Sequence, residues 1–361
     1  MPKGPRFGMV LGIAPLNELV RKAKSAEKGN FDLVCYYDHT LFWSMGEENA
    51  FELWSILTTL ANETSQIKIS PLVTDCLRRH PSITAQTVLT LDQISNGRAI
   101  LAIGSGSPIN LDPYGISWEK PVSKLREAIQ VIKSLWLATE ENPISFNGKF
   151  FSLENAFLQV RSIQQPHPPL YQSAFGPSSR QLAGELATGF LTAIETPQML
   201  QESLKDVQSG TKKAGRSLED LTVLLDVSCA VSMDSEAARK TVEIPLLADI
   251  TSQPFQRKRL GIKDDTPEFK LLDEFRKRGM KGISHDKLMK TVRNAANQIS
   301  PNIIDDLAVF GTPDDCIGQI EKFAQAGVDI FLIENYGPDI LEVERFFAEK
   351  IIPYFSDESE D

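Results

Sequence analysis

The stretch that decides the fold is residues 67–104, which contains the segments IKISPLVT (67–74), ITAQTVLTLDQI (83–94) and RAILAIG (98–104). The first and third segments are short apolar runs rich in Ile, Leu and Val, a pattern typical of strands buried on both faces of a parallel sheet. The middle segment spaces its apolar residues with the period of a helix. The stretch therefore predicts one strand–helix–strand unit, in which the helix connects two parallel strands.

The same alternation extends over the chain in both directions. The predicted strands are Phe7–Ile13, Phe31–Tyr37, Ile67–Thr74, Arg98–Gly104, Leu170–Ala174, Gly189–Ala193, Leu221–Val231 and Val328–Glu334. The predicted helices are Leu16–Lys28, Phe51–Thr64, Ile83–Ile94, Val122–Trp136, Ser178–Leu186, Pro197–Lys213, Pro313–Ala326 and Leu341–Ile351. Eight strand–helix units predict an α/β fold of the (β/α)8, or TIM, barrel type. The alternative, a doubly wound open sheet, rarely needs this many units.

Three long segments interrupt the alternation, and we interpret them as insertions. They lie at about residues 104–120, 140–168 and 244–306. The second contains Asn147-Gly148 between apolar residues, which predicts a β-hairpin. Long loops in a compact domain often carry function, so we expect some of them to cover the active face of the barrel. The domain prediction is a single barrel over residues 1–355, followed by an acidic tail at 356–361.

The composition is that of a globular protein. Hydrophobic residues make up 42% and charged residues 24% of the chain, against averages of about 45–50% and 25%, which excludes a disordered chain. The formal net charge of −10 argues against nucleic-acid binding. The four cysteines form no CxxC pair, so no metal site is predicted. Since no apolar run approaches the roughly 20 residues of a membrane span and the first residues do not resemble a signal peptide, we expect a soluble, cytoplasmic protein that acts on a small molecule.

Candidate catalytic residues follow the second predicted strand. Barrel enzymes place their active sites at the carboxyl ends of the strands, and this strand ends in Tyr37-Asp38-His39, with Trp43 four residues after the histidine. A carboxylate beside an imidazole can orient a group that transfers protons near neutral pH. A polar pair that only caps a loop is the alternative interpretation.

Candidate cofactor-binding residues follow the third, fourth and fifth strands. Gly104–Pro108 consists mostly of small residues that let a flat ligand approach the backbone. Ala174–Ser179 leads into a helix whose N-terminus can bind a phosphate, although ordinary N-capping by serine is the alternative. Arg78-Arg79-His80 is either a basic patch for an anionic group or a solvated loop paired with Asp75. Together these segments indicate a planar cofactor that carries phosphate.

These segments resemble the luciferase-like superfamily of flavin and deazaflavin oxidoreductases. Within it the chain is most similar to the branch that uses coenzyme F420, which includes sugar-phosphate, alcohol and methylene-pterin oxidoreductases. The likeness covers essentially the whole chain and rests on Asp38-His39 with Trp43, Arg78–Pro81, Asn96-Gly97-Arg98, Gly104-Ser105-Gly106, Asn147-Gly148, Ala174–Pro177 and Gly311-Thr312-Pro313. The Asp-His pair followed by the tryptophan is the most specific of these features.

The resemblance implies a homodimeric enzyme with the deazaflavin of F420 lying across the mouth of the barrel; FMN is the alternative cofactor. The implied catalytic residues are His39, which moves the substrate proton, Trp43, which packs over the reaction site, and Asp38. The implied cofactor contacts are Asp38, Pro71, Leu72, Thr74, Ser105, Gly106, Ser107, Ala174, Phe175, Gly176, Pro177, Ser178 and Ser179. The branch also often carries a non-prolyl cis peptide bond at the position of Pro71–Leu72.

The sequence departs from the pattern of this branch at two places, and both departures limit the class of substrate that we expect. Its sugar-phosphate dehydrogenases carry a glutamate as proton donor at the position of Ser107, and basic residues that hold the substrate phosphate at the positions of Thr196 and Asp306. We therefore expect hydride transfer between F420 and a less charged substrate, at a carbonyl/alcohol or C=N/C=C carbon, and not glucose 6-phosphate. An FMN-dependent monooxygenase and a non-catalytic cofactor-binding homologue are the alternatives.

Overall fold

The computed structural model describes residues 4–40, 50–263, 265–278 and 284–357. Ten strands form one parallel sheet in the order β3-β2-β1-β12-β10-β9-β8-β5-β4, with β11 paired to β10. They are β1 (Arg6–Val10), β2 (Leu33–Tyr36), β3 (Lys68–Pro71), β4 (Thr74–Asp75), β5 (Leu101–Gly104), β8 (Leu170–Ser173), β9 (Gly189–Ala193), β10 (Thr222–Val231), β11 (Val309–Gly311) and β12 (Ile330–Asn335). Ile69 of β3 also pairs in parallel with Ala99, just before β5, so the sheet closes into a barrel.

The closed sheet confirms the predicted (β/α)8 barrel. When β3 and β4 are counted as two parts of one strand, the wall has the eight predicted strands, with β11 added beside the end of β10. Strand β11 was not predicted. It pairs Val309–Gly311 with Cys229–Val231, and three residues are too few to display the apolar pattern of a strand.

The barrel interior is filled by every second residue of the strands. Because successive side chains point to opposite faces of a strand, Leu33 and Cys35 of β2 point inward and pack with Leu224 of β10 and Leu332 of β12. The alternate residues, such as Val34, pack outward against the helices in the main core. This two-sided burial is the physical reason for the nearly continuous apolar strands.

Helices form the outer ring of the barrel. They are α1 (Leu16–Lys28), α2 (Leu53–Glu63), α3 (Pro81–Ser95), α4 (Pro121–Leu137), α5 (Pro177–Leu186), α6 (Pro197–Lys213), α11 (Pro313–Gln325), α12 (Ile340–Phe346) and α13 (Ile352–Asp357). Five of them, from α3 to α6 and α11, begin with proline, whose missing N–H costs nothing in a first helical turn. None of the described helices is long and apolar enough to cross a membrane.

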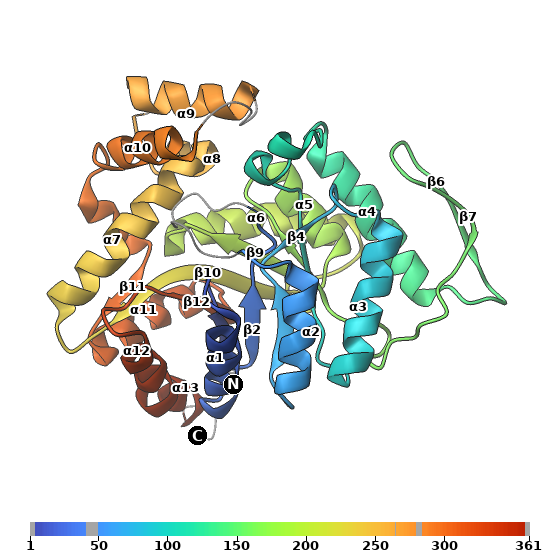
Figure 1. Cartoon of the computed structure of the whole chain (residues 1–361), viewed down its shortest axis with the longest axis horizontal. Helices are drawn as coiled ribbons and strands as arrows, with labels where there is room; N and C mark the ends of the chain where they lie inside the picture. The colour runs from blue at the N-terminus through green and yellow to red at the C-terminus, as the bar shows by residue number, and fades with distance from the viewer. Residues whose placement is uncertain (1–3, 41–49, 264, 279–283, 358–361) are drawn as a thin grey trace.

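The predicted insertions form three different structures. The first contains two short 3-10 turns, Pro108–Asn110 and Asp112–Tyr114. The second contains the predicted hairpin, made of the antiparallel strands β6 (Ile144–Asn147) and β7 (Ser152–Ala156), which projects beyond α3 and α4 (Figure 1). The third contains α8 (Pro254–Arg259), α9 (Pro267–Arg278), α10 (His285–Ala296) and the end of α7 (Ser235–Ser252). Figure 1 shows α7 to α10 grouped at the end of the barrel toward which the β2 arrow points.

One backbone feature lies one residue beyond its predicted position. The non-prolyl cis peptide bond joins Leu72 to Val73, and not Pro71 to Leu72. Pro71 still belongs to β3, and the Leu72 N–H still donates to the Tyr36 carbonyl at 2.8 Å. Leu72 and Val73 separate β3 from β4, so the cis bond lies in the break between the two strands.

Candidate active site

A cavity of about 1050 Å³ lies at the carboxyl ends of the barrel strands. All eight barrel strands, or the residues directly after them, contribute to its lining with Val10, Tyr37, Leu72, Gly104, Ser173, Leu191, Asp226 and Glu334. Helices α7, α8 and α9 contribute Asp249, Phe255 and Leu272 and form a roof over the cavity. The cavity is therefore where barrel enzymes carry their active sites, and one of the insertions covers it.

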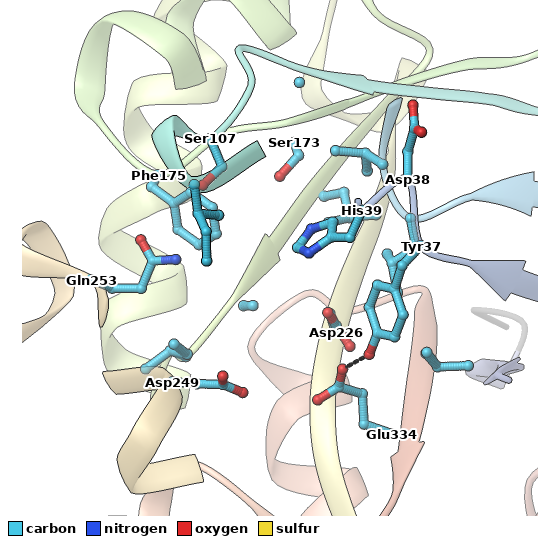
Figure 2. A pocket seen from close by; sticks show the side chains of 18 of the residues that line it. Tyr37, Asp38, His39, Ser107, Ser173, Phe175, Asp226, Asp249, Gln253 and Glu334 are labelled. Atoms are coloured by element: carbon cyan, nitrogen blue, oxygen red, sulfur yellow. Dashed lines mark hydrogen bonds between the residues drawn. The ribbon is translucent and has the colours of Figure 1, made fainter. Parts of the chain in front are cut away.

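Asp38 and His39 follow β2 and point in different directions. Figure 2 shows the His39 ring turned into the cavity and the Asp38 carboxylate turned away from the ring. Neighbouring residues of an extended chain point to opposite sides, so the expected arrangement of a carboxylate beside the imidazole is not formed. The ring of His39 instead lies next to that of Tyr37, with 5.8 Å between the ring centroids.

The Asp38 carboxylate is bound by two arginines. Its Oδ2 accepts a hydrogen bond from Arg79 Nη1 at 2.9 Å and lies 3.0 Å from Arg78 Nη2. Each arginine also pairs with a second carboxylate, Arg78 with Asp75 and Arg79 with Glu52. The predicted basic patch is thus neutralised within the chain, which favours the paired loop over a site for an anion.

Small residues after β5 form one wall of the cavity. Gly106 has a φ of 80°, which glycine adopts without strain, and a Cβ at this position would lie only 3.0 Å from Leu111 Cδ1. Trp118 Nε1 donates to the Ser105 carbonyl at 2.9 Å and fixes the loop. This wall presents backbone to the cavity, as the small residues of the sequence predict for a planar ligand.

The N-terminus of α5 forms a second wall. Its cap residue, Gly176, makes no side-chain capping bond, and a Cβ added there would meet no atom within 4 Å. The first helical hydrogen bond runs from Arg180 N to Gly176 O, so the N–H groups of Ser178 and Ser179 have no acceptor within the helix. Such N–H groups, at the positive end of a helix dipole, suit a phosphate.

Most of the predicted contact residues line this one cavity: Asp38, His39, Leu72, Thr74, Ser105, Gly106, Ser107, Phe175, Gly176, Pro177, Ser178 and Ser179. Pro71 and Ala174 are buried and do not line it. They alternate with Leu72 and Ser173, which do, so their side chains point into the surrounding core. Trp43 lies outside the residues that the structure describes.

Three further carboxyl groups that line the cavity were not predicted. They belong to Asp226 of β10, Asp249 of α7 and Glu334 of β12, and all three are shown in Figure 2. Asp226 and Glu334 interrupt apolar strands and share the inward direction of Leu224 and Leu332. Strand alternation could therefore have placed these two inside the barrel, whereas Asp249 lies on a helix and carries no comparable signal.

The three carboxyl groups share a poorly solvated space. The hydroxyls of Tyr37 and Tyr336 both donate to Glu334. Burial, followed by the charge of Glu334, raises the pKa of Asp226 and of Asp249 well above the usual range. Burial also raises the pKa of Glu334, although the two tyrosine hydrogen bonds oppose that effect. Glu334 is therefore the member best able to carry a negative charge, and the two aspartates favour their neutral form.

Comparison with known proteins adds to this geometry. A family model described as luciferase-like monooxygenase matches residues 4–330. The 5,10-methylenetetrahydromethanopterin reductase of Archaeoglobus fulgidus is 30% identical over 341 residues, which cover 93% of this chain and 95% of that protein.

Two solved structures are similar over nearly their whole length. The coenzyme F420 dependent tetrahydromethanopterin reductase from Methanopyrus kandleri has a TM-score of 0.78 and 26% identity, covering 98% of this chain and 99% of that one. An F420-dependent secondary alcohol dehydrogenase, in complex with an F420-acetone adduct, has a TM-score of 0.80 and 24% identity, with the same coverage. The second likeness shows a shared fold.

Proposed function

The chain belongs to the luciferase-like monooxygenase family, and from this premise we propose that it is an oxidoreductase that uses coenzyme F420 to move a hydride to or from a small organic substrate. The observation that carries the proposal is a single cavity lined by both the N-terminus of α5 and His39. The first suits the phosphate of a cofactor and the second suits proton transfer. The likeness to the coenzyme F420 dependent reductase from Methanopyrus kandleri supports F420 as the cofactor.

The residues of the cavity fit such a cofactor. F420 joins a planar deazaflavin to a chain that carries phosphate, and it supplies or accepts the hydride when bound. Leu72 and Gly106 would contact the ring, and Ser178 and Ser179 would hold the phosphate. The open space in front of Gly176 leaves room for that phosphate. The volume of about 1050 Å³ lies just above the usual range for ligand pockets, about 300–1,000 Å³, so the cavity has room for a substrate as well.

In the proposed reaction, His39 exchanges a proton and the roof of helices α7 to α9 excludes water. A carbonyl that gains a hydride must also gain a proton, and an imidazole facing the cavity can exchange a proton near neutral pH. Helices α7 to α9 cover the cavity, and exclusion of water strengthens electrostatic interactions and prevents side reactions. The protein thus provides orientation, proton transfer and a protected space.

The proposed substrate carries no phosphate group. Thr196 caps α6 by accepting a hydrogen bond from Met199 N at 3.2 Å. The nearby arginines are already paired, because Glu195 binds Arg259 at 2.6 Å and Arg180 at 3.4 Å. We therefore propose reaction at a carbonyl/alcohol or C=N/C=C carbon, and not at glucose 6-phosphate.

The cofactor is tested by titrating the protein separately with F420 and with FMN and following the fluorescence of each. We expect F420 to bind at least about tenfold more tightly, a difference of about 1.4 kcal/mol. Tighter binding of FMN would support the monooxygenase alternative instead. Binding of F420 with no oxidation or reduction of any carbonyl, alcohol or imine would support a non-catalytic homologue.

We also propose that the chain forms a single domain and a cytoplasmic homodimer, as the family resemblance implies. Light scattering should give about twice the 40.1 kDa mass of the chain. A mass of one chain in solution would contradict the dimer.

A further inference from the structure

The carboxyl groups that line the cavity fall into two classes. They are Asp38, Asp75, Asp226, Asp249, Asp273, Glu334 and Glu344. Four of them pair with arginine side chains, namely Asp38, Asp75, Asp273 and Glu344. The charges that act most strongly on Asp226 are instead two further carboxylates, Glu334 and Asp249. An arginine favours the ionised form of a carboxyl group, whereas a neighbouring carboxylate favours the neutral acid.

Among the cavity carboxyl groups that pair with no arginine side chain in the described residues, Asp226 most clearly needs a further hydrogen-bond partner. Its Oδ1 is fully buried and accepts no hydrogen bond from the described part of the chain. The side chain as a whole is only half-buried, because it also lines the cavity. A carboxylate with one sealed and unsatisfied oxygen is costly. Burial costs less free energy for a neutral carboxylic acid, which can donate its proton to a ligand in the cavity.

We propose that Asp226 is the acid that exchanges the substrate proton during the hydride transfer proposed above, and that Glu334, held by Tyr37 and Tyr336, is the positioning residue that keeps Asp226 neutral. This inference rests on the proposed function. It places the proton that reaches the substrate oxygen on a strand residue of β10, and His39, which lines the same cavity, would return a proton from water to Asp226. Figure 2 shows Asp226 near the hydrogen bond between Tyr37 and Glu334.

The proton step balances as follows for the reduction of a carbonyl. The substrate carbon gains a hydride with its electron pair, which comes from the two-electron-reduced deazaflavin. The π electrons of the C=O bond move to the oxygen, and that oxygen takes the proton from Asp226 as the O–H bond of the carboxyl group breaks. The substrate would gain two electrons and the bound cofactor would lose two. The proton left on the deazaflavin after hydride loss would pass to water, and Asp226 would regain a proton from water by way of His39 after the product leaves. Alcohol oxidation runs the same step in reverse.

The groups that face Asp226 from the surrounding elements favour its neutral form. They are Cys35 of β2, Tyr37 directly after β2, Glu334 of β12, Tyr336 directly after β12, and Asp249 of α7. Each of them is neutral or anionic, so none offsets a negative charge on Asp226. An acid whose pKa is raised toward neutral pH transfers protons efficiently there.

Infrared spectroscopy in D2O tests the neutral state without any turnover, because a carboxylic acid has a C=O stretching band that an ionised carboxylate lacks. Spectra are recorded from about pH 5 to pH 9, a range that spans ordinary and raised carboxyl values. The samples are the wild type, Asp226→Asn and a control, Asp206→Asn, whose carboxylate pairs with Arg180 at 3.2 Å and does not line the cavity. We expect the wild type and the control to keep the band at neutral pH and Asp226→Asn to lose part of it. An unchanged band in Asp226→Asn would overturn the proposal.

A second variant, Glu334→Gln, keeps the proposal testable if Asp226→Asn does not fold. Glu334→Gln removes the like charge and keeps an acceptor for the two tyrosines, so the band should disappear at a lower pH than in the wild type. If that pH is unchanged, Glu334 is not the positioning residue.

Rapid mixing with reduced F420 and acetone, as the carbonyl probe, tests the catalytic role. We expect Asp226→Asn to slow the oxidation of reduced F420 by about 100-fold or more, while the F420 dissociation constant changes by less than about threefold. An unchanged rate, or a raised KM with an unchanged kcat, would overturn the proposal and make Asp226 at most a binding group. In either case F420 binding by the wild type keeps the proposed function standing. If the wild type binds no F420, the proposed function itself fails, whatever the variants do.

Discussion

His39 and Asp38 are adjacent in the chain but have separate tasks. The Asp38 carboxylate is bound by Arg78 and Arg79, whereas the His39 ring lies in the cavity beside Tyr37. A change at position 39 therefore leaves the ion pairs of the loop intact, and its effect on activity can be separated from an effect on structure.

We predict that His39→Ala lowers turnover with F420 by about 100-fold or more and changes the F420 dissociation constant by less than about threefold. The physical reason is that, in the proposed reaction, the imidazole exchanges a proton while backbone groups of the cavity wall hold the cofactor. Steady-state kinetics and fluorescence titration measure the two quantities. Equal losses in both would show that His39 binds the cofactor and does not act in the chemistry.

Gly176 offers a test of the phosphate site that costs little stability. A side chain there would extend into open space, and its φ of −98° is accessible to any residue. We predict that Gly176→Leu weakens F420 binding by about tenfold or more, with little change in the unfolding free energy. Gly318→Leu is the matched control, since a Cβ at Gly318 also meets no atom within 4 Å but the residue does not line the cavity. Equal affinities for the two variants would place the phosphate elsewhere.

Asp226 also links stability to pH. Its pKa is raised in the folded state by burial and by Glu334, so the folded protein binds this proton more tightly than the unfolded chain, in which an aspartate titrates near about 3.9. The stability that the neutral acid contributes is complete below that pH and is lost as pH rises through the folded pKa.

Asparagine has no proton to lose, so we predict that the stability of Asp226→Asn relative to the wild type increases by about 1 kcal/mol or more between about pH 4 and pH 8. Urea unfolding at a series of pH values measures this difference. A difference that does not vary with pH would mean that Asp226 titrates in the folded protein as it does in the unfolded chain.

At the scale of elements, α8 joins the roof to the barrel by hydrogen bonds. Gln256 Nε2 donates to the carbonyls of Ala193, the last residue of β9, and Ile194, the next residue, at 2.9 and 3.0 Å. The buried Arg257 donates to the Thr251 carbonyl and pairs with Asp273 of α9 at 2.8 Å. Helix α8 thus connects the barrel wall, α7 and α9.

Arg257→Met should loosen the roof without unfolding the barrel. Breaking a buried ion pair costs about 3–5 kcal/mol, less here because Asp273 is partly exposed. We expect faster hydrogen exchange in residues 245–275 and no change in the barrel strands. Lys258→Met is the matched control, since Lys258 is exposed and next in sequence. Uniformly faster exchange over the whole chain would show that the roof and the barrel unfold together.

The features that were predicted from the sequence depend on neighbouring residues, whereas most of those that were missed depend on contacts between distant segments. The strands and helices of the barrel follow from apolar periodicity, which neighbouring residues carry together. The directions of Asp38 and His39, the break after Leu72 and the position of Asp249 over the barrel depend on contacts between distant segments. Periodicity does not record such contacts. Strand alternation does place Asp226 and Glu334 inside the barrel, so of the three missed carboxyl groups only Asp249 has no signal in the sequence.

At the scale of the whole molecule, an acidic protein encloses a cavity with few free charges. The net charge is −10, and four of the seven carboxyl groups that line the cavity pair with arginines of the chain. The principal attraction for an anionic group is therefore the N-terminus of α5 and not a basic side chain. This arrangement suits a cofactor phosphate and disfavours a second phosphate on the substrate.

Isotope transfer is the most direct test of whether a hydride passes between F420 and the substrate. Reduced F420 that carries deuterium at its hydride-donating carbon is incubated with the enzyme and a panel of ketones and imines, beginning with acetone, and each product is analysed by mass spectrometry. We expect one deuterium on the reduced carbon of the product, and we expect the deuterated product to be lost with His39→Ala. No deuterium in any product, together with turnover that requires FMN and oxygen, would contradict it.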